Sequence, residues 1–413
     1  MDGLRAPLIL HNKNETYQYD EEVIVTVSDW YHNQSSENLK TFLNVNNTKG
    51  VEPVPQSGLI NDHADSNFTF VPGKQYRLRF INMSGFSTFY ISIDDHLLDI
   101  IEVDGVETQR TPVDSIYLTA AQRISAIVTA KNSTKLNYYL HADLDPDMYD
   151  DYPKDLQLNY TAPIYYNEKH HRFAPSKDIG TASAFDDFTL VPLINSTGIL
   201  PKPDRSTNLT FDFGITTDGF NRGFFNNVPY LQPNVPSLNT MLTIGSNYSS
   251  IADAYGPQSM AFVYKHLEVV ELAVTNLDDG SHPFHLHGYT FYMVGRGNGT
   301  WMGDGDQSKI EWSKNPMSRD TILINANSFV LLRFRADNPG AWFFHCHIDW
   351  HLESGLAATI ITAPEVAEQR MSLPQAFKDI CIAGNLPWSG NAAGNLGLDL
   401  TGAPNGIFPK EKV

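Results

Sequence analysis

Short apolar runs, rich in β-branched and aromatic residues, dominate the pattern of hydrophobic and polar positions along the chain. In the first half they lie at 21–31, 74–83, 89–105, 114–130 and 136–144, with turn residues between them. The pattern returns after residue 205, at 208–215, 260–276, 289–297, 320–337 and 341–348. No long window keeps the period of a helix. The chain therefore predicts an all-β fold of tandem Greek-key β-sandwich or barrel domains.

Turn-rich stretches between these runs predict the domain boundaries. Residues 19–165 and 206–365 are each long enough for one β domain. The stretch 166–205, which is interrupted by turn-forming residues, is predicted to link them. Residues 366–413 become rich in Ala, Gly, Asn and Pro and are expected to form a C-terminal tail. Residues 1–18 are too few for a domain, and we expect them to be the remnant of a preceding one.

The composition favours packed globular domains and argues against a nucleic-acid partner and a membrane-spanning segment. Apolar residues make up 41 % of the 413 residues, and charged residues only 18 %. The formal net charge of −18 repels nucleic acid and attracts cations, so a nucleic-acid partner is not expected. The sequence shows neither a signal peptide nor an apolar run long enough to span a bilayer, and we expect no membrane anchor within it.

Asparagine-linked glycosylation acceptors recur along the chain and indicate a glycoprotein of the secretory pathway. We therefore expect a secreted protein or one on the extracellular face of the plasma membrane. The acceptors include Asn14, Asn67, Asn132, Asn195, Asn208, Asn247 and Asn298.

Two short motifs concentrate the residues that bind transition metals. They are HPFHLHG at 282–288 and WFFHCHIDWHLESGL at 342–356. The candidate ligands are His282, His285, His287, His345, Cys346, His347 and His351. Alternate residues of a strand point to the same face, so His345 and His347 face one way and Cys346 the other.

This alternation predicts one metal centre on each side of a single strand. His282 and His351 flank the motifs and can turn toward Cys346, which would form the His₂Cys set typical of a blue-copper electron-transfer site. The other four histidines predict part of a separate imidazole-rich centre. Zinc sites usually lack a cysteine between two histidines, and iron–sulfur clusters need more thiolates. The bonds from Cys346 to its two histidine neighbours would carry electrons between the centres.

Leu356 follows Cys346 by ten residues, where blue-copper sites often supply a weak axial methionine. Leucine cannot coordinate, and the missing donor disfavours Cu(II) relative to Cu(I). We therefore expect a fairly high potential, although a leucine that simply fills the core explains the same residue.

The motifs resemble the two C-terminal signatures of the multicopper oxidases, a family built from three cupredoxin domains. The resemblance covers the second and third of these domains and the end of the first. It implies cupredoxin-like domains, copper as the cofactor, and four copper ions in a complete enzyme. It assigns type 1 copper to His282, Cys346 and His351, type 2 copper to His285, and the type 3 pair to His287, His345 and His347.

The family completes its trinuclear copper cluster with four further histidines in His-x-His motifs of the first domain. No such motif precedes His285 in this sequence. The resemblance therefore implies four of the eight cluster histidines here, and an incomplete cluster without the first domain. Cys381 matches a cysteine whose partner in related oxidases can lie in that domain.

Within the family, the chain looks most similar to the fungal ferroxidases of high-affinity iron uptake. Glu52 in VEPVPQ, Asp150 in DMYDDYPKDLQLN and Asp278 in NLDDGSH match carboxylates that bind Fe(II) and relay its electron to the type 1 histidines. Fe(II) is a hard cation that prefers oxygen donors, and carboxylates stabilise Fe(III) even more. The resemblance thus implies Fe(II) and O₂ as substrates.

Two further segments bear on this resemblance. Arg222 in FNRGFFNN replaces an aromatic residue near the iron site, and a cation that faced inward there would repel iron. Asp186 and Asp187 in AFDDFTL resemble a segment that related ferroxidases use when they pair with an iron permease. An exposed acidic turn explains these two residues equally well.

Two other functions stay open on the sequence alone. A laccase-type phenol oxidase would accept aromatic donors beside the same type 1 histidine. A fragment that holds only blue copper would have no oxygen chemistry, and its copper content would be one ion per chain rather than four.

Overall fold

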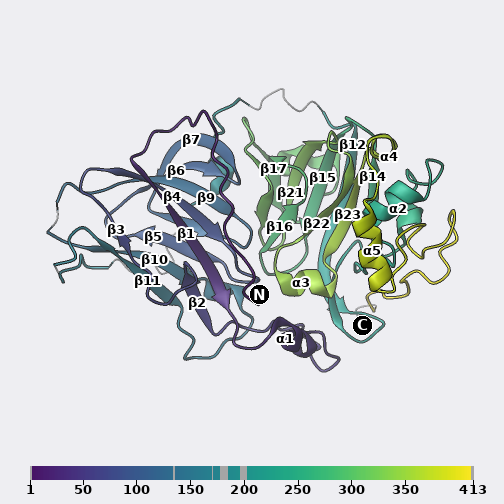
Figure 1. Cartoon of the computed structure of the whole chain (residues 1–413), viewed down its shortest axis with the longest axis horizontal. Helices are drawn as coiled ribbons and strands as arrows, with labels where there is room; N and C mark the ends of the chain where they lie inside the picture. The colour runs from purple at the N-terminus through teal and green to yellow at the C-terminus, as the bar shows by residue number, and fades with distance from the viewer. Residues whose placement is uncertain (1, 134, 170, 177–184, 196–201, 411–413) are drawn as a thin grey trace. The chain divides into compact units, whose positions relative to one another are not determined.

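The computed structural model describes residues 2–133, 135–169, 171–176, 185–195 and 202–410. The chain forms two compact units (Figure 1). Unit 1 contains Met1–Phe42, Val51–Asn195 and Asn315–Ile322, and unit 2 contains Leu43–Gly50, Ser196–Lys314 and Leu323–Val413. One of the points where the chain passes from unit 1 to unit 2, after Asn195, lies within the stretch 166–205.

Unit 1 is a pair of β-sheets with an apolar layer between them. One sheet has the order β2 (Ser57–Ile60), β1 (Glu21–Trp30), β4 (Gln75–Asn82), β9 (Arg123–Thr129), β6 (Leu98–Val103) and β7 (Val106–Val113). The other has the order β3 (Phe68–Thr69), β11 (Asn159–Tyr165), β10 (Tyr138–Leu144), β5 (Phe89–Ile93) and β8 (Ser115–Leu118). Tyr76, Leu78 and Phe80 alternate along β4 and are buried in this layer with Ile91 and Leu140 of the second sheet.

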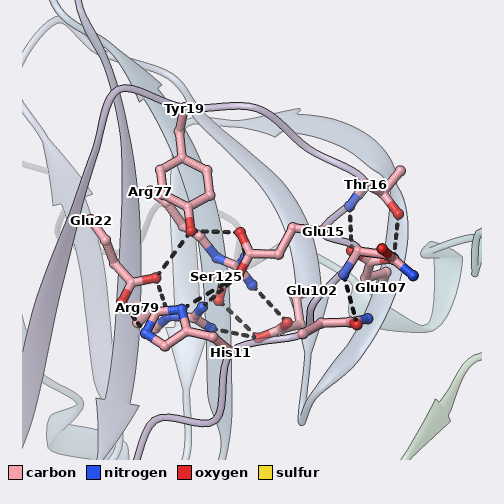
Figure 2. A network of polar contacts seen from close by, with 12 residues as sticks. His11, Glu15, Thr16, Tyr19, Glu22, Arg77, Arg79, Glu102, Glu107 and Ser125 are labelled. Atoms are coloured by element: carbon pink, nitrogen blue, oxygen red, sulfur yellow. Dashed lines mark hydrogen bonds and ion pairs between the residues drawn. The ribbon is translucent and has the colours of Figure 1, made fainter.

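The other face of the first sheet carries a network of ion pairs (Figure 2). Arg77 and Arg79, which alternate with the core positions of β4, both pair with Glu102 of β6. Glu15, from the N-terminal segment, pairs with Arg77 at 3.2 Å. Buried charges need such partners, because an uncompensated guanidinium in the interior is strongly destabilising. The network thus holds the N-terminal segment on unit 1, although this segment forms no helix or strand where the structure describes it.

The segment Asn315–Ile322, which includes β19 (Ser318–Arg319), is fastened to unit 1 by charged side chains. Arg123 donates to the two carboxylate oxygens of Asp320 at 2.7 and 2.5 Å. Arg319, only 1 % exposed, donates to Asp187 at 2.5 Å. These pairs bring a segment from the second half of the sequence into the first unit.

Unit 2 contains a second pair of sheets. One includes, in order, β13 (Asn221–Phe225), β12 (Arg205–Ile215), β15 (Val269–Asn276), β21 (Ser328–Arg335), β17 (Phe291–Asn298) and β18 (Glu311–Trp312). The other has the order β14 (Ala261–Tyr264), β23 (Ala357–Thr362), β22 (Gly340–Cys346), β16 (His282–Leu286) and β20 (Thr321–Ile324). Phe211 and Phe225 of the first sheet contact Phe284 of the second, with ring centroids 4.8 and 5.6 Å apart. The aromatic side chains therefore fill the space between the sheets.

Short helices lie between the strands and after the last strand, β23, and the sequence pattern did not predict them. The α-helices in the described residues are α1 (Ser35–Phe42), α2 (Ser237–Thr243), α3 (Asp349–Ser354), α4 (Pro364–Arg370) and α5 (Gln375–Ala383). The 3₁₀ helices are η1 (Pro146–Met148), η2 (Asp187–Thr189), η3 (Ala252–Tyr255) and η4 (Asp304–Lys309). Each is too short to show a helical period in the sequence. Among the described residues, no helix has the length and apolar character needed to cross a membrane.

Candidate metal centre

The two ligand motifs lie on neighbouring antiparallel strands of unit 2. In the register of β16 with β22, Phe284 is opposite Cys346 and His285 is opposite His345. Since alternate residues share a face, His285 and His345 lie on one face of the sheet and Cys346 on the other. The strands thus place the two groups of ligands as the alternation in the sequence predicts.

His282, Cys346 and His351 converge on the Cys346 face, and we call them the His-Cys-His set. Their donor atoms all lie within 4.8 Å of one another. Cys346 Sγ is 3.5 Å from Nδ1 of His351 and 3.9 Å from Nδ1 of His282, and the two nitrogens are 3.1 Å apart. All three side chains are buried. One thiol and two imidazoles in this arrangement fit the ligand set of a blue-copper centre.

The electrostatics of this set favour the metal-binding form of the cysteine. Burial raises the pKa of the Cys346 thiol, but the neighbouring His351 and hydrogen bonds with both histidines outweigh burial and lower the pKa to about 7. Burial lowers the pKa of His282, but its hydrogen bonds to Asp278 and Cys346 raise that pKa on balance. The thiolate is the form that binds metals, so the lowered pKa favours the ligand form of Cys346.

Asp278 orients His282 from outside the set. Its Oδ2 accepts hydrogen bonds from His282 Nε2 and from the Gly280 N–H, each at 2.9 Å. This leaves His282 Nδ1 directed at Cys346, as ligand histidines commonly require. Burial opposes ionisation of Asp278, but the hydrogen bond and charge of His282 lower its pKa overall. The side chain is still 27 % exposed, so a solvated cation can reach this carboxylate.

His285, His287, His345 and His347 cluster on the opposite face. Ring centroids are 4.9 Å apart for His285 and His287, 5.2 Å for His287 and His345, and 5.3 Å for His345 and His347. The Cys346 carbonyl accepts a hydrogen bond from Nδ1 of His345 at 2.9 Å, and His345 Nε2 lies 3.1 Å from His287 Nε2. Burial and the neighbouring His347 lower the pKa of His345 to about 3, which keeps it neutral as a metal ligand must be.

Sequence reasoning missed the aromatic wall of the His-Cys-His set. Phe213 of β12 stacks on His282, with centroids 5.3 Å apart and planes at 27°, and contacts His351 at 4.7 Å. Phe211, two residues earlier on the same face, meets the His282 ring at 5.2 Å and 86°. The only signal in the sequence is the apolar alternation of FDFGI, which is typical of any half-buried strand.

Two other residues singled out from the sequence lie near the set. Leu356 is fully buried, its carbonyl accepts the Cys346 N–H at 3.1 Å, and its N–H donates to the His351 carbonyl at 2.9 Å. Arg222 pairs with Asp218 at 2.9 Å and is largely buried. The carboxylate of Asp218 therefore compensates the charge of Arg222.

The remaining candidate carboxylates belong to unit 1. Glu52 is half-buried and Asp150 is exposed, and their approach to Asp278 stays a prediction. Asp186 accepts a hydrogen bond from the Phe188 N–H at 3.2 Å at the start of η2, and Asp187 is held by Arg319. Both acidic residues thus have contacts within unit 1, and docking of an iron permease on them also stays a prediction.

Comparison with known proteins places these features in context. Residues 21–169 and 230–366 match two family models, each described as multicopper oxidase. The chain is 42 % identical to the iron transport multicopper oxidase fio1 of Schizosaccharomyces pombe, over 98 % of this chain and 65 % of that protein. It is 41 % identical to the iron transport multicopper oxidase fetC of Epichloe festucae, over 97 % of this chain and 65 % of that protein. The chain therefore spans slightly less than two thirds of the length of these relatives.

Solved structures show the same architecture. The crystal structure of Fet3p, a multicopper oxidase that functions in iron import, matches with a TM-score of 0.91 and 33 % identity, over 97 % of this chain and 77 % of that chain. A laccase from Botrytis aclada matches with a TM-score of 0.73 and 23 % identity, over 91 % of this chain and 70 % of that chain. These matches confirm the predicted all-β fold of cupredoxin-like domains.

Proposed function

The chain belongs to the multicopper oxidase family, and we propose that it is of the ferroxidase type, oxidising Fe(II) to Fe(III) for iron uptake. One observation carries the choice of iron. Asp278 Oδ2 lies 2.9 Å from Nε2 of His282, so a solvent-accessible carboxylate is hydrogen-bonded directly to a member of the His-Cys-His set. The names of the relatives, which are iron transport oxidases, support the same substrate.

Copper fits both groups of ligands. The buried Cys346 thiol has a lowered pKa, and two imidazole nitrogens converge on it. Four imidazoles cluster on the other face, and burial lowers the pKa of one of them, His345. Copper held by the His-Cys-His set would supply one-electron redox chemistry, and copper held by a complete trinuclear cluster would supply the four-electron reduction of O₂. We assign type 1 copper to the His-Cys-His set, type 2 copper to His285, and the type 3 pair to His287, His345 and His347.

The carboxylates supply the selectivity for iron in this proposal. Asp278 binds substrate Fe(II) while its hydrogen bond keeps His282 in place, and Glu52 and Asp150 supply further oxygen donors. Carboxylates stabilise Fe(III) more than Fe(II), which favours loss of the electron. Backbone bonds from Cys346 to His345 and His347 connect the two groups of ligands covalently.

Reduction of O₂ belongs to the complete enzyme in this proposal, because this sequence supplies four of the eight cluster histidines that the family uses. A cell-surface or secreted location agrees with the glycosylation acceptors along the chain. It also agrees with iron transport in the relatives. Pairing with an iron permease at Asp186 and Asp187 is part of the same proposal. A permease would have to compete with the contacts that these two carboxylates make to the Phe188 N–H and to Arg319.

The test uses the copper-loaded chain and needs no oxygen reduction. Total copper and the visible spectrum are measured first, and the chain is then mixed without oxygen with Fe(II) or a phenol while the blue absorption is followed. We expect Fe(II) to bleach the blue colour faster than the phenol does. Asp278→Ala and Glu52→Ala should each slow bleaching by Fe(II) roughly 10-fold or more and leave bleaching by the phenol much less affected.

Asp279→Ala is the matched control, because Asp279 is the exposed carboxylate next to Asp278. Equal rates with Fe(II) for the wild-type chain, Asp278→Ala and Glu52→Ala would contradict the iron site. Faster bleaching by the phenol would favour a laccase. A chain without blue colour would contradict the type 1 assignment, and one copper per chain rather than four would show that the cluster does not assemble from this sequence alone.

A further inference from the structure

Phe213 lies beside both histidines of the His-Cys-His set and is partly exposed. Its ring contacts both imidazoles of the set, at 5.3 Å from His282 and 4.7 Å from His351. Phe211 also contacts His282, but it is fully buried and belongs to the aromatic layer between the sheets. Phe213 is only half-buried. It therefore forms part of the boundary between the two histidines and solvent, and it has no atom that could bind a metal.

The neighbouring strand holds this ring in position. Phe213 is opposite Gly223 in the register of β12 with β13. A Cβ atom on residue 223 would lie 2.9 Å from the Phe213 ring and 2.9 Å from Cβ of Leu356, so glycine lets both side chains approach. The Gly223 N–H donates to Ser354 Oγ at 3.0 Å, and Ser354 Oγ donates to the His351 carbonyl at 2.9 Å. Strand β13 is thus joined to the helix that carries His351.

We propose that Phe213 is a positioning residue of the copper site, which holds His282 and His351 in their converging arrangement and keeps water away from the metal. The inference rests on copper binding by the His-Cys-His set, as proposed above, and does not depend on iron as the substrate. Contact with the Phe213 ring, stacked on His282 and tilted on His351, restricts rotation of both imidazoles, so less order must be created when the metal binds. An apolar ring at the boundary disfavours the more highly charged Cu(II) state, which raises the reduction potential.

The first test compares four variants of the copper-loaded chain. Phe213→Ala should weaken copper binding about 10-fold in chelator competition, lower the reduction potential and alter the blue absorption band. Phe213→Tyr keeps the ring and should retain the wild-type copper affinity, reduction potential and absorption band. Phe213→Leu keeps an apolar side chain without the ring, and should retain most of the potential while still binding copper more weakly. Phe262→Ala removes a half-buried phenylalanine from β14 of the same unit and should change none of these values.

A second test uses the chain without copper. Phe213→Ala should let iodoacetamide label Cys346 several-fold faster at one fixed pH, with Cys381 as the internal reference read by mass spectrometry. A blue wild-type chain whose Phe213→Ala and Phe213→Leu variants keep the same copper affinity, potential and labelling rate would overturn the inference. A wild-type chain that binds no copper would contradict the proposed function instead, and the labelling rates would still decide whether Phe213 shields the site.

Discussion

Leu356 illustrates what one residue can decide about the copper site. It is fully buried and its backbone is hydrogen-bonded to both Cys346 and His351. Blue-copper sites often carry a weak axial methionine in this neighbourhood of the sequence, and the axial ligand tunes the potential. Leucine offers no donor, and the high potential that follows from this stays a prediction.

Leu356→Met should lower the reduction potential, because a thioether donor stabilises Cu(II) relative to Cu(I). The swap nearly conserves volume, so the cost in stability should stay under about 1.5 kcal/mol. A redox titration of the blue absorption measures the effect, and Leu352→Met, a substitution within helix α3, is the control. Identical potentials in wild type and Leu356→Met would mean that the side chain of residue 356 does not approach the metal.

Asp278 connects the predicted iron site with a candidate copper ligand. The sequence offered it as an iron ligand that relays an electron to the type 1 histidines, and in the structure its carboxylate is hydrogen-bonded to His282. The same carboxylate therefore bears on substrate binding and on the orientation of a copper ligand. This is why its variants must be compared with Fe(II) and with a phenol, since only the second donor reports damage to the copper site alone.

At the scale of elements, the hairpin of β12 and β13 determines how closely the site is enclosed. Two of its glycines make very different contacts. A Cβ on residue 223 would meet Phe213 and Leu356 at 2.9 Å, which is closer than side chains normally pack. A Cβ on Gly214 would meet only the Phe224 ring, at 3.7 Å, an ordinary contact distance.

Gly223→Ala should therefore displace Phe213 or Leu356, cost about 1–3 kcal/mol of stability, and weaken copper binding. Gly214→Ala, in the same hairpin, should leave copper binding close to wild type. Thermal unfolding of the copper-free chains and chelator competition of the loaded chains measure the two effects. If both variants bind copper equally well, close packing at Gly223 does not support the site.

The strands were predictable and the helices were not, for physical reasons. The β-branched and aromatic residues of runs such as 320–337 and 341–348, which lie between turns, predict strands. Helix α3 has only six residues, too few for a helical period to appear, yet it brings His351 to Cys346. Its ending depends on Gly355 in the left-handed region, at φ 116°.

At the scale of the whole molecule, the packing of Asn315–Ile322 with unit 1 depends on an unusual group of charges. Asp104 is fully buried, pairs with Arg123 at 3.3 Å, and accepts the Thr321 N–H at 3.2 Å. Burial is the main cause that raises the pKa of Asp104, to about 6. Asp320 and Asp187 already balance Arg123 and Arg319, so a protonated Asp104 leaves this group close to neutral.

This arrangement predicts a pH dependence of stability. Between about pH 4, the ordinary pKa of Asp, and about pH 6, the folded chain binds a proton that the unfolded chain releases. The Asp104 contribution should therefore be present below about pH 4 and be lost as the pH rises through 6. Urea unfolding at several pH values should show this loss in wild type and not in Asp104→Asn. Parallel pH profiles of the urea midpoint in the two proteins would rule the effect out.

The all-β fold, the two ligand motifs, and the division of their ligands between opposite faces of a strand could be predicted from the sequence alone. These are local properties. The alternation of side chains along a strand and the donor chemistry of His and Cys can be recognised without knowing any distant contact. Tertiary structure decided that His282 and His351 turn toward Cys346, that Phe213 and Gly223 close the site, and that residues 315–322 pack in unit 1. Each of these depends on contacts between residues far apart in the chain, which only the packing of complete sheets can bring together.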